Sequence, residues 1–460
     1  MTGNGRGPMS QPNRKDNPGT HHLLPTPAPK EIFPMPDAKA SPAHGPRSAR
    51  PGGRGDWSIR PIPLLEQALR LMMGIALLLA TLLTLWPALN PALLVASRMT
   101  SPPAEGIWTT FANGDDVRAL ALEADVLWAG TKNGGVVRWS IPEGTYVQYL
   151  YPQDGLAGND VRGVVMDDGG RKWFATNRGV SILDDGGTAD KSDDTWTTHL
   201  PNEDVTAIAM DSLGRVWVGT NGSGVARFDG HEWRTYTHDP ENPSAGPVID
   251  EISALIVDDA DQVWVAYGHA GYGVSVFNGS RWITYTSINS ALPWDKVMAM
   301  APGYGGVWLG TWGRGACFVE SHRFVTYTTA DGLGSNYILT ITIGQDGRAW
   351  FGLGRSSGGG KGVSLLDGAD TPHDKEDDEW TRYREEDGLA SDTVWAIAIG
   401  DGEAWFGTAP VCSGFGGCRG GGLSRFDVDQ NQWCPPYTTA QTGLASNQIT
   451  AIAFDAEGQA

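Results

Sequence analysis

Short runs of alternating apolar and polar residues, separated by turn residues, recur along most of the chain. In residues 204–237 four such runs cover 205–210, 216–219, 225–228 and 233–236. Asp, Asn and Gly fill the intervals between them, so this stretch predicts a four-stranded antiparallel meander. A single sheet of this kind cannot bury both of its faces, and it therefore needs neighbours.

A tryptophan in the second run returns at a nearly constant interval. The seven positions are Trp128, Trp173, Trp217, Trp264, Trp308, Trp350 and Trp405. Their separations are 45, 44, 47, 44, 42 and 55 residues. Four strands in every period of this length are typical of a β-propeller. We therefore expect an all-β ring of seven complete four-stranded blades within residues 107–460.

Each position within the unit has its own residue chemistry. The innermost strands are expected at 117–122, 161–166, 205–210, 252–257, 297–301, 338–343 and 394–399. An acidic or glycine turn follows, as at 167–170, 211–214 and 258–261, where Asp is expected to cap backbone amides. The outermost strands carry Trp196, Trp233, Trp282, Phe324, Trp380 and Trp433.

The connections between units have a shared sequence, as in Asp331-Gly-Leu-Gly-Ser-Asn336 and Asp387-Gly-Leu-Ala-Ser-Asp392. This pattern, followed by Val-x-Ala-Ile and then Asp-x-x-Gly-x-x-Trp-x-Gly-Thr, resembles the two-component regulator propeller repeat. The resemblance covers about residues 107–460. It implies a ligand-sensing propeller like the extracytoplasmic sensor portions of membrane-bound histidine kinases. The chain departs from those kinases because no phosphoacceptor histidine domain or ATP-binding domain follows.

Two strands stand outside the seven units. Residues 107–111 form an orphan outer strand, and residues 448–455 form an orphan inner strand. Propeller rings avoid free edges, and terminal strands often supply the closure. A partial eighth blade built from both would still lack its two middle strands. We therefore expect either a chain that is cut short or leftover strands that sit imperfectly against a seven-bladed ring.

The first hundred residues have a different composition. Residues 1–60 are rich in Pro, Gly, Ser and Arg, which predicts a disordered tail. Residues 61–98 contain a long uncharged apolar run that matches a transmembrane signal-anchor helix, and 99–106 form a linker. Arginines gather before the helix, so the tail is expected in the cytoplasm and the propeller outside the membrane. A cleavable signal peptide is the alternative.

The charge of the chain limits the kinds of partner it can bind, and its cysteines indicate a possible disulfide. From residue 104 onward there are 23 Lys/Arg and 48 Asp/Glu, and this acidic surface repels nucleic acid. Cys412 and Cys418 lie in a glycine-rich loop and are candidates for a small disulfide, with Cys434 as the alternative partner of either. The Asp-rich stretches at 184–194 and 374–379 lack the ligand spacing of a calcium loop, which favours solvated charge. No metal or cofactor is expected.

Candidate binding residues lie where loops converge over the channel, at positions that differ from unit to unit. Arginines and aromatic rings at such positions suit a sugar ring or an acidic group, whereas an ordinary wet loop surface is the simpler interpretation. The candidates are Arg118, Arg162, Arg178, Tyr267, His269, Tyr272, Trp294, Trp312, Arg314, Arg355 and Trp395.

Three classes of function remain open at this stage. We expect a membrane-anchored binding or sensing ectodomain that takes a small-molecule or glycan ligand, or contacts a membrane signalling partner, without catalysis. A cell-surface scaffold for protein interactions is the first alternative. A propeller lyase or glycosidase is the second, and it would need two carboxylates, or a histidine and a carboxylate, at the channel mouth.

Overall fold

The structure is a computed structural model. It describes residues 116–354, 360–368, 371–400, 402–413, 417–442, 444 and 446–454, with side chains throughout except at 412–418. The expected tail, membrane helix, linker and outer strand at 107–111 lie outside these residues. Among the residues that are described, no helix is long and apolar enough to cross a bilayer.

Seven four-stranded antiparallel sheets account for nearly all of the strands. Blade 1 contains β1 (Val117–Glu123), β2 (Val126–Thr131), β3 (Val136–Ser140) and β4 (Thr145–Tyr149). Blade 2 contains β5 (Val161–Met166), β6 (Lys172–Thr176), β7 (Gly179–Asp184) and β8 (Thr195–His199). Blade 3 contains β9 (Val205–Met210), β10 (Val216–Thr220), β11 (Val225–Phe228) and β12 (Trp233–Tyr236).

The remaining blades repeat this order. Blade 4 contains β13 (Ala254–Val257), β14 (Val263–Ala266), β15 (Val274–Phe277) and β16 (Trp282–Tyr285), with the 3-10 helix η1 (Gly268–Ala270) between β14 and β15. Blade 5 contains β17 (Val297–Gly303), β18 (Gly306–Thr311), β19 (Ala316–Glu320) and β20 (Arg323–Tyr327). Blade 6 contains β21 (Ile338–Ile343), β22 (Ala349–Gly354), β23 (Gly360–Asp367) and β24 (Glu379–Tyr383). Blade 7 contains β25 (Val394–Gly400), β26 (Glu403–Thr408), β29 (Gly422–Asp427) and β30 (Gln432–Trp433), interrupted by the hairpin β27 (Val411–Ser413) and β28 (Gly417–Arg419).

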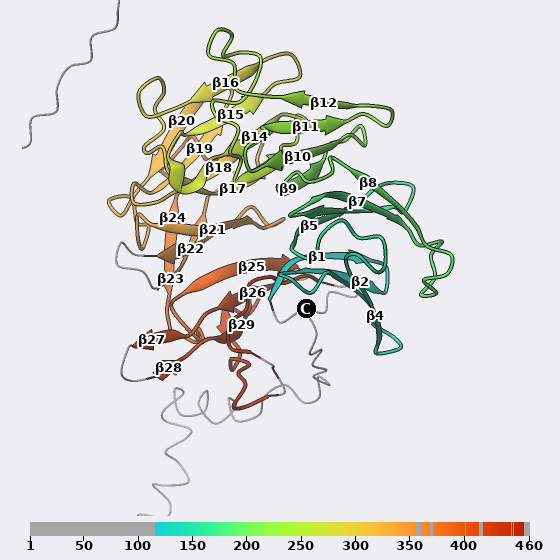
Figure 1. Ribbon diagram of the computed structural model, residues 1–460. Helices are drawn as coiled ribbons and strands as arrows, with labels where there is room; N and C mark the ends of the chain where they lie inside the picture. The colour runs from blue at the N-terminus through green and yellow to red at the C-terminus, as the bar shows by residue number, and fades with distance from the viewer. Residues whose placement is uncertain are drawn as a thin grey trace, which may run out of the picture. The chain divides into compact units, whose positions relative to one another are not determined.

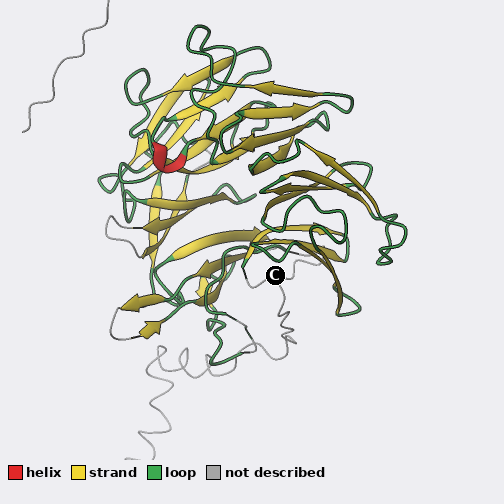
Figure 2. Ribbon diagram, viewed as in Figure 1, coloured by secondary structure: helices red, strands yellow, loops and turns green. Residues whose placement is uncertain are grey.

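The blades follow one another around a common centre, with the first strand of each innermost (Figure 1). Each first strand packs beside the first strand of the next blade, from β1 to β25 in chain order. Turns and loops link the strands at both faces of the ring (Figure 2). The predicted seven-bladed all-β propeller is confirmed.

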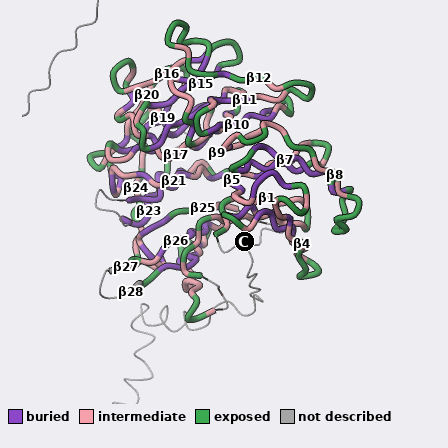
Figure 3. Tube along the Cα trace, viewed as in Figure 1, coloured by how far each residue is buried: buried purple, intermediate pink, exposed green. Residues whose placement is uncertain are grey.

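Tryptophan fills the space between blades. All seven repeating indoles are at most 8% exposed, and the buried positions follow the middle strands (Figure 3). Within blade 3, Trp217 of β10 stacks on Tyr236 of β12 with 5.8 Å between ring centroids. Between blades, Trp350 of blade 6 contacts Phe406 of blade 7 at 5.3 Å. Trp217 therefore joins strands of its own sheet, and Trp350 covers the facing surface of the next one.

A glycine two residues after the tryptophan permits this close approach. A Cβ on Gly219 would lie 2.6 Å from Ile252, the first residue of the next inner segment. The equivalent distance from Gly310 to Ile338 is also 2.6 Å. Since neither glycine has a positive φ, the reason for glycine here is space between blades and not backbone conformation.

The orphan inner strand occupies an eighth position in the ring. Ile449 N donates to Thr408 O at 3.0 Å, as Ile252 N donates to Thr220 O at the boundary between blades 3 and 4. On the other side, Thr450 Oγ1 donates to Val117 O at 2.7 Å. Residues 448–454 therefore lie between blade 7 and blade 1 with a hydrogen bond to each, although they form no regular strand. The expectation of a chain that is cut short, or of leftover strands that sit imperfectly against the ring, stays a prediction.

Candidate functional site

The turns between second and third strands lie on the same face as the connections between blades. Gly224 N, in the turn between β10 and β11, donates to Asp250 O ahead of blade 4 at 3.0 Å. Gly315 N donates in the same way to Asn336 O at 2.9 Å. We call this surface the loop face. The predicted candidates come from these turns, from the blade connections and from the beginnings of the inner strands.

Three rings from neighbouring blades meet on the loop face. His269 in η1 lies against Trp312 with 5.3 Å between ring centroids and 80° between planes. Trp312 in turn lies against Tyr337 at 5.5 Å and 88°. We call His269, Trp312 and Tyr337 the aromatic row. The sequence had indicated His269 and Trp312, whereas Tyr337 was missed because it immediately precedes an inner strand and resembles a core residue there.

Local backbone geometry places these rings. Gly313, next to Trp312, has φ +118°, and a Cβ there would lie 3.1 Å from the Tyr337 ring. Glycine is therefore required both for the turn and for the approach of the tyrosine. Backbone hydrogen bonding between Trp312 and Lys296, at 2.9 Å, fixes the tryptophan at the edge of its blade. Hydrogen-bonded turns therefore hold the aromatic row in place.

A cation and further rings lie on the same blades. The Arg314 guanidinium lies 5.0 Å from the centroid of the Trp294 ring, which is 36% exposed. Tyr272 is 46% exposed and contacts Tyr267 edge-on at 6.3 Å. Tyr267 itself is buried, and its hydroxyl donates to Ser275 Oγ at 2.6 Å. Burial raises the pKa of Tyr267, so this residue supports the site from within and is not available to a ligand.

Two of the predicted arginines form a different feature, on blades 1 to 3. Arg118 and Arg162 share Asp160, each with an N–O distance of 3.1 Å. Arg162 also pairs with Asp204 at 2.7 Å. We call Arg118, Asp160, Arg162 and Asp204 the charged row. Because its cations are already paired across blade boundaries, the row joins blades and leaves less positive charge for a ligand.

The other candidates are dispersed. The Arg178 guanidinium lies 4.6 Å from the centroid of the Tyr151 ring, and Trp395 is 49% exposed at the start of β25. Arg355 lies outside the described residues. The structure therefore brings together His269, Trp312, Trp294 and Arg314 on neighbouring blades, and it does not gather all eleven candidates at one point.

The acidic turns on the opposite face are structural. Asp167 Oδ1 accepts from the amides of Gly169 and Arg171, both at 3.0 Å. Its Oδ2 accepts from Trp173 Nε1 at 2.8 Å. Asp211 makes the same two kinds of contact with its turn and with Trp217. The predicted capping of turn amides is confirmed, and the sequence analysis had missed the bond to the indole.

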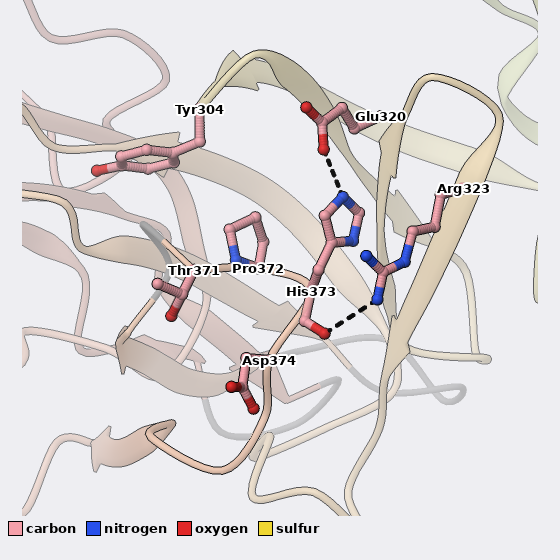
Figure 4. Close-up of a pocket in the computed structure, with 7 residues that line it drawn as sticks. All are labelled: Tyr304, Glu320, Arg323, Thr371, Pro372, His373 and Asp374. Carbon is pink, nitrogen blue, oxygen red and sulfur yellow. Dashed lines mark hydrogen bonds and ion pairs between the residues drawn. The ribbon is translucent and has the colours of Figure 1, made fainter.

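A histidine and a carboxylate do meet, but far from the channel mouth. His373 Nε2 lies 2.5 Å from Glu320 Oε2, and Arg323 donates to the His373 carbonyl at 3.3 Å (Figure 4). These residues line a hollow of about 450 Å³ between the turn after β19 and the loop after β23. Both segments belong to the face opposite the loop face. The pair therefore fastens a long loop to the adjacent blade and does not supply the channel-mouth constellation that an enzyme would need.

The cysteine and metal predictions have different outcomes. The backbone of β27 and β28 places Cys412 directly opposite Cys418 in an antiparallel pair, and the disulfide between them stays a prediction. Cys434 is a free cysteine whose sulfur accepts from Arg425 Nε at 3.3 Å, so the alternative pairing is not formed. Among the described residues, no cluster of three or more histidine, cysteine or acidic side chains is arranged to hold a metal ion.

Comparison with known proteins identifies the repeat. Residues 199–222 match the family model described as two component regulator propeller. Within these residues the chain is similar to one copy of the two-component regulator propeller repeat. No curated protein is similar enough to this chain to count as a match.

Several solved structures are similar to this chain in fold. A computationally designed protein, Ika8, is 14% identical, with 74% of this chain and 91% of that chain covered and a TM-score of 0.51. The extracellular domain of a protein described as a one-component system of B. thetaiotaomicron is 14% identical, with 77% and 58% covered and a TM-score of 0.32. Virginiamycin B lyase of Staphylococcus aureus is 13% identical, with 64% and 92% covered and a TM-score of 0.44. The chain thus spans little more than half of the B. thetaiotaomicron domain, and these identities speak for the fold alone.

Proposed function

We propose that this chain is a membrane-anchored, extracytoplasmic binding propeller that takes a glycan or a small acidic molecule on its loop face and has no catalytic activity of its own. The observation that carries the proposal is the aromatic row. His269 is exposed and Trp312 and Tyr337 are partly exposed, so the row offers a surface on which the apolar face of a sugar ring can stack.

Arg314 and Trp294 extend this surface toward acidic ligands. Arg314 is exposed, lies over the Trp294 ring, and carries a fork of N–H donors that matches a carboxylate. The carboxylates of the charged row, Asp160 and Asp204, are occupied by arginines. This occupation favours binding over hydrolysis, because neither acid is left as an unpaired general acid or base.

The sensing role rests on the regulator propeller repeat, which in the related kinases forms extracytoplasmic sensor portions. Placement outside the membrane rests on the apolar run within 61–98 and the arginines before it. A membrane signalling partner would then relay occupancy of the loop face to the cell interior.

Binding is best tested with the purified protein against a panel of glycans and small organic acids, first by thermal shift and then by titration calorimetry. We expect at least one ligand to bind, and Trp312→Ala to weaken it by about tenfold or more, equivalent to about 1.4 kcal/mol. Leu213→Ala is the matched control, since Leu213 is 69% exposed on a turn of the opposite face. The proposal fails if no ligand is found, or if both variants bind as the parent does.

A further inference from the structure

Three blade boundaries share one aromatic contact at the outer edge of the ring. The fourth strands β4, β12 and β20 each end in a tyrosine, and its ring meets the tryptophan of the next blade's fourth strand. The distances between ring centroids are 5.5 to 5.9 Å in the pairs Tyr149–Trp196, Tyr236–Trp282 and Tyr327–Trp380. These boundaries can therefore be compared position by position.

At two of the three boundaries a long loop of the next blade lies over the tyrosine. The loop after β7 places Lys191 Nζ 4.8 Å from the centroid of the Tyr149 ring. The loop after β23 places Lys375 Nζ 4.4 Å from the centroid of the Tyr327 ring. At the boundary between blades 3 and 4, only the short turn at 278–281 joins β15 to β16. A pocket of about 380 Å³ lies there.

This pocket, which we call the edge pocket, has a basic lining. Arg227 of β11, Arg234 of β12 and Arg281 beside β16 all line it. Within the continuously described range 116–354, no carboxylate lines it. The whole chain has a net charge of −19, so three arginines around one pocket without an acid run against its composition.

The three guanidinium groups are poorly neutralised. Arg234 and Arg281 are exposed, and neither forms an ion pair with a described residue. The Arg227 guanidinium has one described ion-pair partner, Asp229, at a long N–O distance of 3.7 Å. Its Nε is buried and has no hydrogen-bond partner among the described residues. The edge pocket therefore offers positive charge that the protein itself leaves largely free.

A buried hydroxyl adds a second unused donor. Tyr236 lines the edge pocket, is 5% exposed, and its hydroxyl has no partner among the described residues. At the boundary between blades 5 and 6, the equivalent Tyr327 hydroxyl donates to Pro372 O at 3.1 Å. Because a buried donor without an acceptor is unfavourable, an oxygen bound in the edge pocket would be stabilised by Tyr236.

The boundary between blades 1 and 2 shows which group is missing. Arg138 is the equivalent of Arg227, since each pairs across its sheet with the repeating tryptophan and lies over that ring, at 5.8 and 5.7 Å. Arg138 forms an ion pair with Asp185 of the next blade at 3.5 Å. By strand register, the residue of blade 4 at the position of Asp185 is Gly279, which lines the edge pocket. A Cβ on Gly279 would meet no atom within 4 Å, so the space of the missing carboxylate is open.

We propose that the edge pocket is a second ligand site, separate from the loop face, and that it binds a small organic anion with at least two oxyanion groups. One group occupies the place of the Asp185 carboxylate, against Arg227 and the Tyr236 hydroxyl. Arg234 and Arg281 bind the other, because guanidinium forks match the oxygens of carboxylate, phosphate and sulfate. The turn at 278–281 joins a third strand to a fourth and so lies on the face opposite the aromatic row.

The test is titration calorimetry of the full chain with citrate, inorganic phosphate and inorganic sulfate at constant low ionic strength, since salt screens such contacts. We expect saturable binding, tightest for citrate, and we expect Arg227→Gln and Arg281→Gln each to weaken it by about tenfold or more. Arg348→Gln is the matched control, because it removes the same charge from an ion pair on blade 6. Trp312→Ala and Arg314→Gln on the loop face should leave the binding unchanged.

A second pair of variants keeps the test decisive if an arginine variant does not fold. Gly279→Asp supplies the missing carboxylate from within, whereas Gly279→Asn brings the same backbone strain at φ +87° without the charge. Gly279→Asp should bind citrate about tenfold more weakly than Gly279→Asn.

Three outcomes would overturn the inference. In the first, none of the three anions binds saturably. In the second, Arg227→Gln weakens binding no more than Arg348→Gln does, and the two Gly279 variants bind alike. In the third, Arg314→Gln weakens binding and Arg227→Gln does not, which would place the anion on the loop face and support the proposed function instead.

Discussion

Substitution of Asp167 tests how an acidic turn and a tryptophan are joined in one blade. Its two carboxylate oxygens accept different hydrogen bonds. Oδ1 accepts from turn amides, and Oδ2 accepts from Trp173 Nε1 and from Arg171 Nε, both at 2.8 Å. Asp167→Asn preserves size but replaces one acceptor by an NH2 donor. Whichever way the amide turns, it points a donor at other donors, so either the turn or the indole loses its partner.

The expected cost follows from these contacts. Hydrogen bonds to a charged group contribute about 1.5–3 kcal/mol each, and an orphaned buried donor costs about 1–3 kcal/mol. Trp173 is 1% exposed, so an indole N–H that loses Asp167 stays largely buried. We therefore expect Asp167→Asn to lower the free energy of unfolding by about 3 kcal/mol, measured by urea denaturation followed with far-UV circular dichroism.

The structure offers a matched control for the indole. Trp308 is fully buried like Trp173, but its Nε1 has no hydrogen-bond partner. Trp308→Phe therefore removes packing only, whereas Trp173→Phe removes packing and the bond to Asp167. Trp173→Phe should cost about 1.5 kcal/mol more than Trp308→Phe, and this excess should vanish when Asp167 is already Asn. Equal losses in both tryptophan variants would refute the argument.

The pH dependence gives an independent check. Burial acts to raise the pKa of Asp167, but hydrogen bonds from Trp173 and Arg171 outweigh it and hold the pKa below the ordinary value of 3.8. A lowered pKa means that the stabilisation is present above pH 3.8 and is lost as the pH falls through the folded-state value. The difference in free energy of unfolding between the parent and Asp167→Asn should thus be largest at pH 7 and should shrink below pH 3.8.

Three further perturbations address the packing and the buried charges. Gly219→Ala should lower the free energy of unfolding by about 1–3 kcal/mol in denaturant, because the new Cβ would lie 2.6 Å from Ile252. Adding Ile252→Ala should recover part of this loss, and strictly additive losses in the double variant would contradict the contact. Lys172→Val should cost about 3 kcal/mol, because it strips a buried Asp185 of a partner at 2.8 Å, and a neutral single variant would contradict this. Adding Asp185→Asn should restore only part of the stability, because Asp185 also pairs with the buried Arg138 at 3.5 Å. Burial and the neighbouring Asp377 raise the pKa of Asp378 to about 6, so the folded state disfavours the charged carboxylate. The folded protein is therefore most stable while Asp378 is protonated, and this contribution to the free energy of unfolding is lost as the pH rises through about 6. Asp378→Asn should therefore leave the melting temperature unchanged below pH 4 and raise it at pH 7, and a lower value at pH 7 would contradict the assignment.

Much of the fold could be predicted from the sequence because the signal is repeated. The strands at 161–166, 205–210, 225–228, 233–236 and 338–343 have the bounds expected from alternation. One unit alone would not have fixed the first and last residues of these strands. Seven units do so, because the same residue types recur at the same positions in each unit. The hairpin at β27 and β28 was missed because its glycine-rich sequence has no apolar alternation.

The candidate site was less predictable, because it depends on which side chains meet across blades. Arg118 and Arg162 stand at variable positions and so resembled ligand-binding residues, but they lie within reach of acids on the next blade. Tyr267 was a candidate by position, yet it turns inward to Ser275. Tyr337 joins the site only through its contact with Trp312, and no pattern along the chain indicates that contact.

The binding proposal is tested most directly by a hydrogen-exchange footprint of the protein at saturation with a ligand found in the titration panel. The proposal predicts slower exchange in the loop-face segments at 267–273 and 312–315, where the aromatic row stands, and unchanged exchange in the opposite-face turns at 167–170 and 211–214. Protection that appears instead around Glu320 and His373, or nowhere on the loop face, would contradict it.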